Sequence, residues 1–137
     1  MKVKCCDQAE DRLLRFAVII ARSGGKWVLC KHRERDTLEI PGGRREPGED
    51  IGWTAVRELR EETGAKNFSI RPICAYAVVR EGEESFGMLY YADIRSFSPE
   101  LHSEIEQVFL LETLPENWTY PDIQPVLLRE AARRGVL

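Results

Sequence analysis

The chain has 137 residues, 43% of them hydrophobic and 31% charged, a composition typical of a globular protein with a packed core. This length suits one domain, so we expect residues 1–137 to form a single domain whose residues 1–11 are flexible or peripheral. The formal net charge of −3 argues against binding to long nucleic acid, and no segment approaches the roughly 18 consecutive apolar residues of a membrane span.

The first third of the chain predicts two strands and a glycine turn. Leu13–Ala21 is apolar and rich in β-branched residues, which predicts a buried strand. Ser23–Gly25 is a turn, and Lys26–His32 returns as a second strand, so a hairpin is expected. The charged loop Arg33–Asp36 leads to a short apolar stretch and then to the breaker run Pro41–Gly43.

A helix is predicted over about residues 50–63. Pro47 and Gly48 mark the turn before it, and Gly64 is well placed as its C-cap. Its apolar residues follow the helical period of about 3.6; they are Ile51, Ala55, Val56 and Leu59.

The second half of the chain predicts strands followed by one helix. Phe68–Val79 and Phe86–Ile94 read as long strands joined by the polar turn Glu81–Glu84, and Val108–Leu111 reads as a short strand. A final helix is expected from Tyr120 to about Arg134. These elements predict an α+β domain with a mixed sheet.

The four cysteines do not form a C-x-x-C pattern. Cys30 and Cys74 lie in apolar runs and are expected to be buried thiols, whereas the adjacent pair Cys5 and Cys6 is weak evidence for a metal or redox site. The polar, charged first 12 residues do not resemble a secretory signal, so the cytoplasm is the expected compartment.

Three glutamates share one face of the predicted helix. Glu58, Glu61 and Glu62 lie at positions i, i+3 and i+4, where like charges repel. Folding does not require that repulsion, but a divalent cation would reverse it, because carboxylate oxygens are ligands that Mg²⁺ prefers. Glu49 would add a ligand or cap the helix, and Arg57 can reach Glu61 at i+4. The alternative is a solvated acidic face.

The glycine run before the helix favours the metal-site interpretation. Gly42 and Gly43 let the backbone approach a ligand closely and offer carbonyls to a metal and N–H groups to a phosphate. From Gly43 onward the segment resembles the Nudix box, a glycine, five residues, a glutamate, seven residues and then Arg-Glu-U-x-Glu-Glu-x-Gly-U, where U is a bulky aliphatic residue. The matching residues are Gly43, Glu49, Arg57, Glu58, Leu59, Glu61, Glu62 and Gly64, and only Ala65 is smaller than usual.

This resemblance implies a fold and a reaction. The Nudix family has an α/β/α sandwich around a mixed sheet, with a catalytic helix and a C-terminal helix, and hydrolyses nucleoside diphosphates linked to another group with Mg²⁺ or Mn²⁺. By resemblance Glu58 and Glu62 are the first metal ligands, followed by Glu61 and the Gly43 carbonyl. Arg57, Glu58 and Glu61 are expected to be catalytic, with Arg57 holding a carboxylate in place.

The general base is open between a box glutamate and a later acid. Glu104 and Glu106 precede the predicted strand at Val108, where relatives carry an additional acid, and we prefer Glu106. The alternative is that both are surface charges.

Substrate residues are expected outside the helix. Gly42, Gly43 and Arg33 are candidates for the phosphates, and Tyr120 and Asp122, in a stretch similar to MutT-like enzymes, for the base. Asp122 could equally be a carboxylate at a helix N-terminus. Surface positions are favoured for Arg44, Arg45 and His32.

The expected activity is Mg²⁺-dependent hydrolysis of an oxidised purine nucleotide such as 8-oxo-dGTP to the monophosphate and pyrophosphate. The alternatives are ADP-ribose or another nucleotide sugar, a dinucleoside polyphosphate, a capped RNA 5′ end, or a non-catalytic module that senses nucleotides. The expected partner is a small nucleotide-type substrate, and the expected assembly is a monomer or a homodimer.

Overall fold

The structure is a computed structural model, in which residues 1–99 and 105–137 are described. Within these residues one sheet of seven strands is accompanied by two α-helices and a short 3-10 turn at Asp11–Leu13. The strands are β1 (Lys2–Cys6), β2 (Leu14–Ser23), β3 (Lys26–His32), β4 (Gly42–Arg44), β5 (Ala65–Arg80), β6 (Glu83–Phe97) and β7 (Ile105–Leu111). The helices are α1 (Ile51–Thr63) and α2 (Gln124–Arg133).

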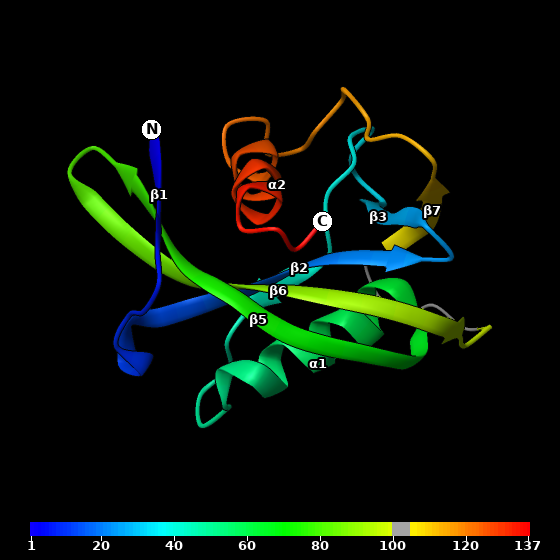
Figure 1. Cartoon of the computed structure of the whole chain (residues 1–137), viewed down its shortest axis with the longest axis horizontal. Helices are drawn as coiled ribbons and strands as arrows, with labels where there is room; N and C mark the ends of the chain where they lie inside the picture. The colour runs from blue at the N-terminus through cyan, green and yellow to red at the C-terminus, as the bar shows by residue number, and fades with distance from the viewer. Residues whose placement is uncertain (100–104) are drawn as a thin grey trace.

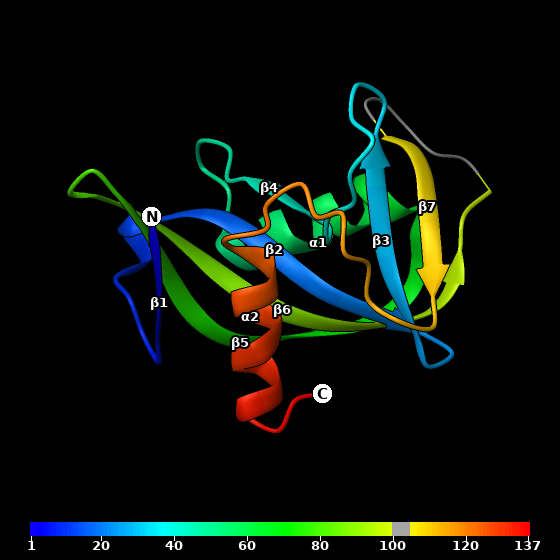
Figure 2. The same cartoon turned by 90° about the horizontal axis from the view of Figure 1, so that it is seen from above.

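The sheet is mixed and carries one helix on each face. Its strand order is β1-β5-β6-β2-β3-β7, with β4 paired to β2 beside this path. The β2–β6 pair is parallel and the others are antiparallel. Helices α1 and α2 lie on opposite sides of the sheet (Figures 1 and 2). This arrangement confirms the predicted α/β/α sandwich.

Alternation along the buried strands produces two hydrophobic cores. In β2, Ile19 faces α1 and packs with Leu59, whereas its neighbour Ile20 faces α2 and packs with Leu127. All four side chains are fully buried. Because successive side chains of a strand point to opposite faces, a central strand covered on both sides is apolar throughout, which is the pattern of residues 16–21.

Strands β2 and β3 diverge, and the glycine segment, residues 41–44, lies in the gap between them. β3 pairs with β2 only over the last residues of β2, and β4 pairs with β2 further back. The connecting residues fill the gap, since the Ile19 N–H donates to the Pro41 carbonyl at 2.8 Å and Cys30 pairs with Glu39 through two backbone hydrogen bonds of 2.9 and 3.0 Å. The sequence predicted only a turn at residues 41–43, but the structure places Gly42 and Gly43 in a short strand beside α1.

Helix α1 ends where local signals predicted. The Asp50 side chain accepts a hydrogen bond from the Gly52 N–H at 3.0 Å, and Gly64 adopts a left-handed φ of 76° as C-cap. Helix α2, in contrast, begins at Gln124 and not at Tyr120. The predicted start is wrong because residues 121–123 form a turn, in which the Ile123 N–H donates to the Tyr120 carbonyl at 3.1 Å, and residues 117–119 are extended beside Leu38.

The N-terminal segment lies at the edge of the sheet. Lys2–Cys6 forms β1, an edge strand whose Cys5 lies opposite Tyr76 of β5. The Lys2–Cys6 segment has too few apolar residues to predict a strand. The unpaired backbone groups at the edge of β5 provide the hydrogen bonds that stabilise β1. The cysteine prediction is confirmed for Cys30 and Cys74, which are fully buried. In the described part of the chain, neither helix has the length and apolarity to cross a membrane.

Candidate active site

Two carboxylates of α1 converge on the glycines of β4. A Cβ added at Gly43 would lie 2.5 and 2.6 Å from the two carboxylate oxygens of Glu58, so only glycine leaves room for this contact. The Gly42 N–H donates to Glu62 Oε1 at 2.6 Å. The backbone of β4 and the acidic face of α1 therefore form one surface, as the spacing of the sequence predicted.

Arg57 fixes the carboxylates around it. Its guanidinium donates to Glu49 at 2.7 and 3.0 Å, to Glu58 at 2.7 Å and to the Arg44 carbonyl at 3.0 Å. The predicted contact with Glu61 is present but longer, at 3.4 Å. These bonds tie the loop before α1, the helix itself and β4 together through one side chain.

Glu49 serves this network and does not cap the helix. Asp50 is the N-cap, and Glu49 also accepts from the Thr54 hydroxyl at 2.7 Å. The Arg57 hydrogen bonds lower the pKa of Glu49 to about 2, so it is ionised across the physiological range. The alternative that Glu49 caps the helix is therefore wrong. Glu49 anchors Arg57, and its role as a metal ligand stays a prediction.

The site carries more negative charge than its own cations balance. Burial, together with the nearby charge of Glu62, raises the pKa of Glu58 to about 7 despite the opposing Arg57. A cation close to Glu58 would stabilise the ionised form of this carboxylate. The hard oxygen donors of Glu58 and Glu62, with the Gly43 backbone beside them and Glu61 half-exposed at the rim, therefore fit a divalent ion such as Mg²⁺.

His32 and Glu39 extend the acidic site toward β3. The His32 imidazole is 22% exposed, and its Nε2 lies 3.0 Å from Glu39 Oε1 and 3.2 Å from Glu62 Oε2. The hydrogen bond with Glu62 raises the pKa of His32, and burial raises that of Glu39. The surface position expected for His32 is therefore wrong, and Glu39 is a residue of this site that the sequence did not predict. A glutamate between two apolar residues, Leu38 and Ile40, was the available signal.

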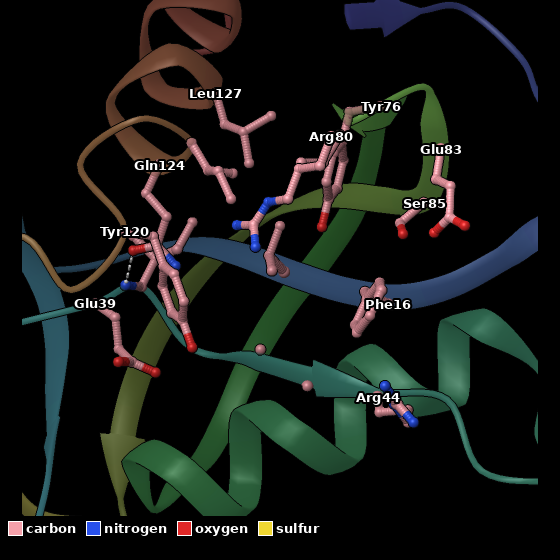
Figure 3. A pocket seen from close by; sticks show the side chains of 16 residues that line it. Phe16, Glu39, Arg44, Tyr76, Arg80, Glu83, Ser85, Tyr120, Gln124 and Leu127 are labelled. Atoms are coloured by element: carbon pink, nitrogen blue, oxygen red, sulfur yellow. Dashed lines mark hydrogen bonds between the residues drawn. The ribbon is translucent and has the colours of Figure 1, made fainter. Parts of the chain in front are cut away.

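A cavity of about 430 Å³ opens on the side of β4 that faces away from α1, next to α2 (Figure 3). Gly42 and Gly43 line it, so the cavity and the acidic surface share the β4 backbone. Gln124 is only 4% exposed, and its side-chain oxygen accepts from the Ile40 N–H at 2.8 Å, which leaves its NH₂ group for the cavity. The Arg80 guanidinium projects into the same space.

The remaining predicted substrate residues divide into those inside and outside this cavity. Tyr120 lines it, and its hydroxyl accepts a hydrogen bond from Arg35 at 3.1 Å. Arg33 and Asp122 are exposed and do not line it. Of the two candidate bases, Glu104 lies outside the described residues, and for Glu106 the structure describes only the backbone, in β7.

The two arginines after Gly43 have different environments. Arg44 lines the cavity with its guanidinium over the Phe16 ring. Arg45 holds the N-terminal region instead, because it donates to the Asp11 carboxylate at 3.0 Å and to the Glu49 carbonyl at 2.6 Å. Arg44 is thus the one of the pair that a cavity ligand would meet.

Comparison with known proteins identifies relatives across nearly the whole chain. A family model described as NUDIX domain matches residues 11–130. The Bacillus subtilis protein named "Putative 8-oxo-dGTP diphosphatase YtkD" is 37% identical over 100 residues, covering 72% of this chain and 63% of that protein. An ADP-ribose pyrophosphatase of the same species is 33% identical over 102 residues, covering 72% of this chain and 45% of that protein. The chain thus spans less than two thirds of these curated relatives.

Structural similarity is more extensive. The crystal structure of the Bacillus subtilis pyrophosphohydrolase BsRppH superposes with a TM-score of 0.82 and 30% sequence identity, covering 97% of this chain and 91% of that one. The structural similarity therefore covers nearly the whole chain.

Proposed function

The chain belongs to the Nudix family, and from this membership we propose that it is a divalent-metal-dependent pyrophosphohydrolase of small nucleotide-type substrates. The observation that carries the proposal is the convergence of Glu58 and Glu62 on the Gly42–Gly43 backbone, with a cavity on the other side of that backbone. A purely structural acidic helix has no need of either feature.

In this proposal Glu58 and Glu62 hold the cation, with Glu61 and the Gly43 carbonyl at the edge of the site. Bound Mg²⁺ or Mn²⁺ supplies polarisation of phosphoryl oxygens and a more acidic water. The protein keeps the ligands in place: Arg57 orients Glu58, and the Gly42 N–H orients Glu62. Preorganised ligands of this kind lower the barrier because the site does not rearrange during reaction.

The cavity is proposed to hold the nucleoside. The Tyr120 ring offers a stacking surface, and the Gln124 NH₂ group offers donors to a carbonyl on the base. Asp122 is left out of this nucleoside site, because it does not line the cavity, whereas Arg33 stays a proposed contact for the phosphates.

An oxidised purine nucleotide such as 8-oxo-dGTP is the proposed substrate. Its support is the similarity to YtkD together with a donor placed to read a purine carbonyl. ADP-ribose is the second candidate, supported by the similarity to the ADP-ribose pyrophosphatase. Glu106 remains our proposed general base, with a box glutamate as the alternative.

A hydrolysis screen tests the proposal directly. The purified chain is incubated with canonical and oxidised dNTPs, ADP-ribose, dinucleoside polyphosphates and capped RNA, with and without Mg²⁺, and the products are separated. We expect Mg²⁺-dependent turnover of 8-oxo-dGTP, with ADP-ribose turned over less or not at all.

Substitution of Glu62 links the turnover to the helix. Glu62→Gln should reduce kcat at least about 100-fold while the circular dichroism spectrum is unchanged, because it removes a charged metal ligand and retains the shape. Glu112→Gln, on an exposed residue after β7, is the matched control and should retain full activity. Absence of turnover with every substrate, or full activity in Glu62→Gln, would contradict the proposal.

A further inference from the structure

A second set of metal-binding side chains lies beside the carboxylates assigned to Mg²⁺. Cys30 and His32 occupy alternate positions of β3 and therefore share the face of the strand that looks at α1. Glu62 approaches from the helix. One ligand atom from each of these residues, Sγ, Nε2 and a carboxylate oxygen, lies within 4.8 Å of the others.

A fourth donor adjoins this set. Glu39 is the backbone partner of Cys30, and its Oε1 lies 3.0 Å from His32 Nε2. Sulfur, imidazole nitrogen and one carboxylate oxygen thus gather where two neighbouring segments of the sheet meet the helix, and the second carboxylate lies beside the imidazole. Four donors of this kind suit a tetrahedral site, and thiolate with imidazole favours Zn²⁺ over Mg²⁺.

The pattern differs from ordinary core packing. Cys30, Glu39 and Glu62 are each less than 9% exposed, and a buried carboxylate needs a charged or hydrogen-bonding partner. Here two buried carboxylates each direct one oxygen at the same imidazole nitrogen, at 3.0 and 3.2 Å, while their other oxygens accept from Arg35 at 3.5 Å and from the Gly42 N–H at 2.6 Å. A divalent cation at that point would satisfy both carboxylates at once.

We propose that Cys30, His32 and Glu62, with Glu39 as the fourth ligand, form a binding site for a thiophilic divalent cation such as Zn²⁺. Binding forms the metal–sulfur, metal–nitrogen and metal–oxygen bonds and releases to solvent the thiol proton of Cys30 and any proton on His32 Nε2. No electrons are transferred. Because Cys30 is fully buried, the cation enters only when the region between β3 and α1 opens.

The site shares Glu62 with the proposed Mg²⁺ site, and this gives it a regulatory consequence. A bound Zn²⁺ would withdraw Glu62 from the catalytic cation and inhibit hydrolysis. The inhibition rests on the proposed function, whereas Zn²⁺ binding does not, so the two are measured separately.

Cobalt spectroscopy tests the site without reference to activity. Co²⁺ is titrated into the reduced, metal-free full-length chain, and the near-ultraviolet thiolate-to-cobalt band and the visible tetrahedral bands are recorded, followed by displacement with Zn²⁺. We expect both sets of bands in the parent protein and loss of the near-ultraviolet band in Cys30→Ser. His32→Gln should weaken the apparent Zn²⁺ affinity at least about tenfold.

Two controls identify the thiol. Cys74→Ser removes another fully buried thiol and should leave the spectrum unchanged, and the double variant Cys5→Ser/Cys6→Ser should do the same. If Cys30→Ser does not fold, Cys30→Ala provides the same test of the thiol, and His32→Gln tests the imidazole. Absence of the band in the parent protein, its survival without Cys30, or its loss in the Cys5/Cys6 variant would overturn the proposal. A cobalt site in a chain without hydrolase activity would refute only the proposed function.

Discussion

At the scale of residues, the adjacent glycines of β4 are required for different reasons. A Cβ at Gly42 would lie 2.6 Å from the Ala17 carbonyl oxygen and 2.9 Å from the Val18 Cα, both backbone atoms of β2. The three atoms nearest to a Cβ at Gly43 all belong to the Glu58 carboxylate. Gly42 is therefore needed for the pairing of β4 with β2, and Gly43 for the position of the Glu58 carboxylate.

This difference predicts that substitution by alanine affects Mg²⁺ dependence at Gly43 and stability at Gly42. Gly43→Ala should leave the thermal unfolding midpoint within a few degrees of the parent, because the Glu58 side chain can move, but should raise the Mg²⁺ concentration for half-maximal activity at least about tenfold. Gly42→Ala should instead lower stability by about 1–3 kcal/mol, because backbone cannot yield easily. Chemical denaturation and Mg²⁺ titrations of activity measure both. Loss of stability in Gly43→Ala with unchanged Mg²⁺ dependence would refute this assignment.

At the scale of elements, α1 and α2 are attached to the glycine segment by different means. Helix α1 reaches it through charged side chains, with Arg57 donating to the Arg44 carbonyl and Glu62 accepting from the Gly42 N–H. Helix α2 reaches it through the neutral amide of Gln124, which accepts from the Ile40 N–H. The segment is therefore fixed from both faces of the sheet, and the shape of the site depends on both helices.

The α2 attachment predicts a stability defect for Gln124→Leu. The substitution leaves the buried Ile40 N–H without its partner, and an unsatisfied buried donor costs about 1–3 kcal/mol. Urea unfolding followed by circular dichroism measures the change. Gln107→Leu, on an exposed position of β7, is the matched control and should change stability by less than about 0.5 kcal/mol. Equal stability of Gln124→Leu and the parent would show that the amide does not hold this segment.

At the scale of the whole molecule, the sheet separates two chemical environments. The face under α1 gathers carboxylates around a deficit of positive charge, and the face under α2 encloses the cavity with Tyr120 and Gln124 (Figure 3). The thin β4 strand is the boundary between them. A nucleotide lying across this boundary would place its phosphates on the acidic side, beside the cation, and its base in the cavity.

A cluster of charged side chains at the end of α2, away from β4, predicts how the stability of the folded state changes with acid. Hydrogen bonds from Arg133 and Arg134 lower the pKa of Glu130 to about 2, below its ordinary value of 4.5. A carboxylate with a lowered folded pKa stabilises the fold above its unfolded pKa, and this contribution disappears as the pH falls from about 4.5 toward 2.

Glu130→Gln should therefore flatten part of the acid-induced loss of stability. Unfolding by urea is measured between pH 6 and pH 2 at low ionic strength, because salt screens exposed pairs. The difference in stability between the parent and the variant should be largest at pH 6 and vanish near pH 2. Glu112→Gln should follow the parent at every pH. A constant difference across the range would show that Glu130 acts by packing and not by charge.

Much of this molecule was predictable from local sequence signals. The catalytic helix was expected at residues 50–63 and is found at 51–63, because Asp50, the apolar spacing and Gly64 determine its ends without help from distant residues. The strand Lys26–His32 was predicted with its observed ends. The spacing of Gly43, Glu58 and Glu62 likewise predicted their convergence and the family, since a glycine turn and one helix face decide it.

Other features required the tertiary structure, because they depend on segments far apart in the chain. β1 forms a strand because it pairs with the edge of β5. The chain before α2 is extended because residues 117–119 lie against Leu38. His32, Glu39 and Glu62 meet only when β3, its neighbouring segment and α1 pack together. Local sequence signals were enough to predict the acidic helix and the shared face of Glu58, Glu61 and Glu62, because that spacing is set within one helix. The cavity, and the imidazole between two buried carboxylates, were decided by long-range packing that no local pattern records.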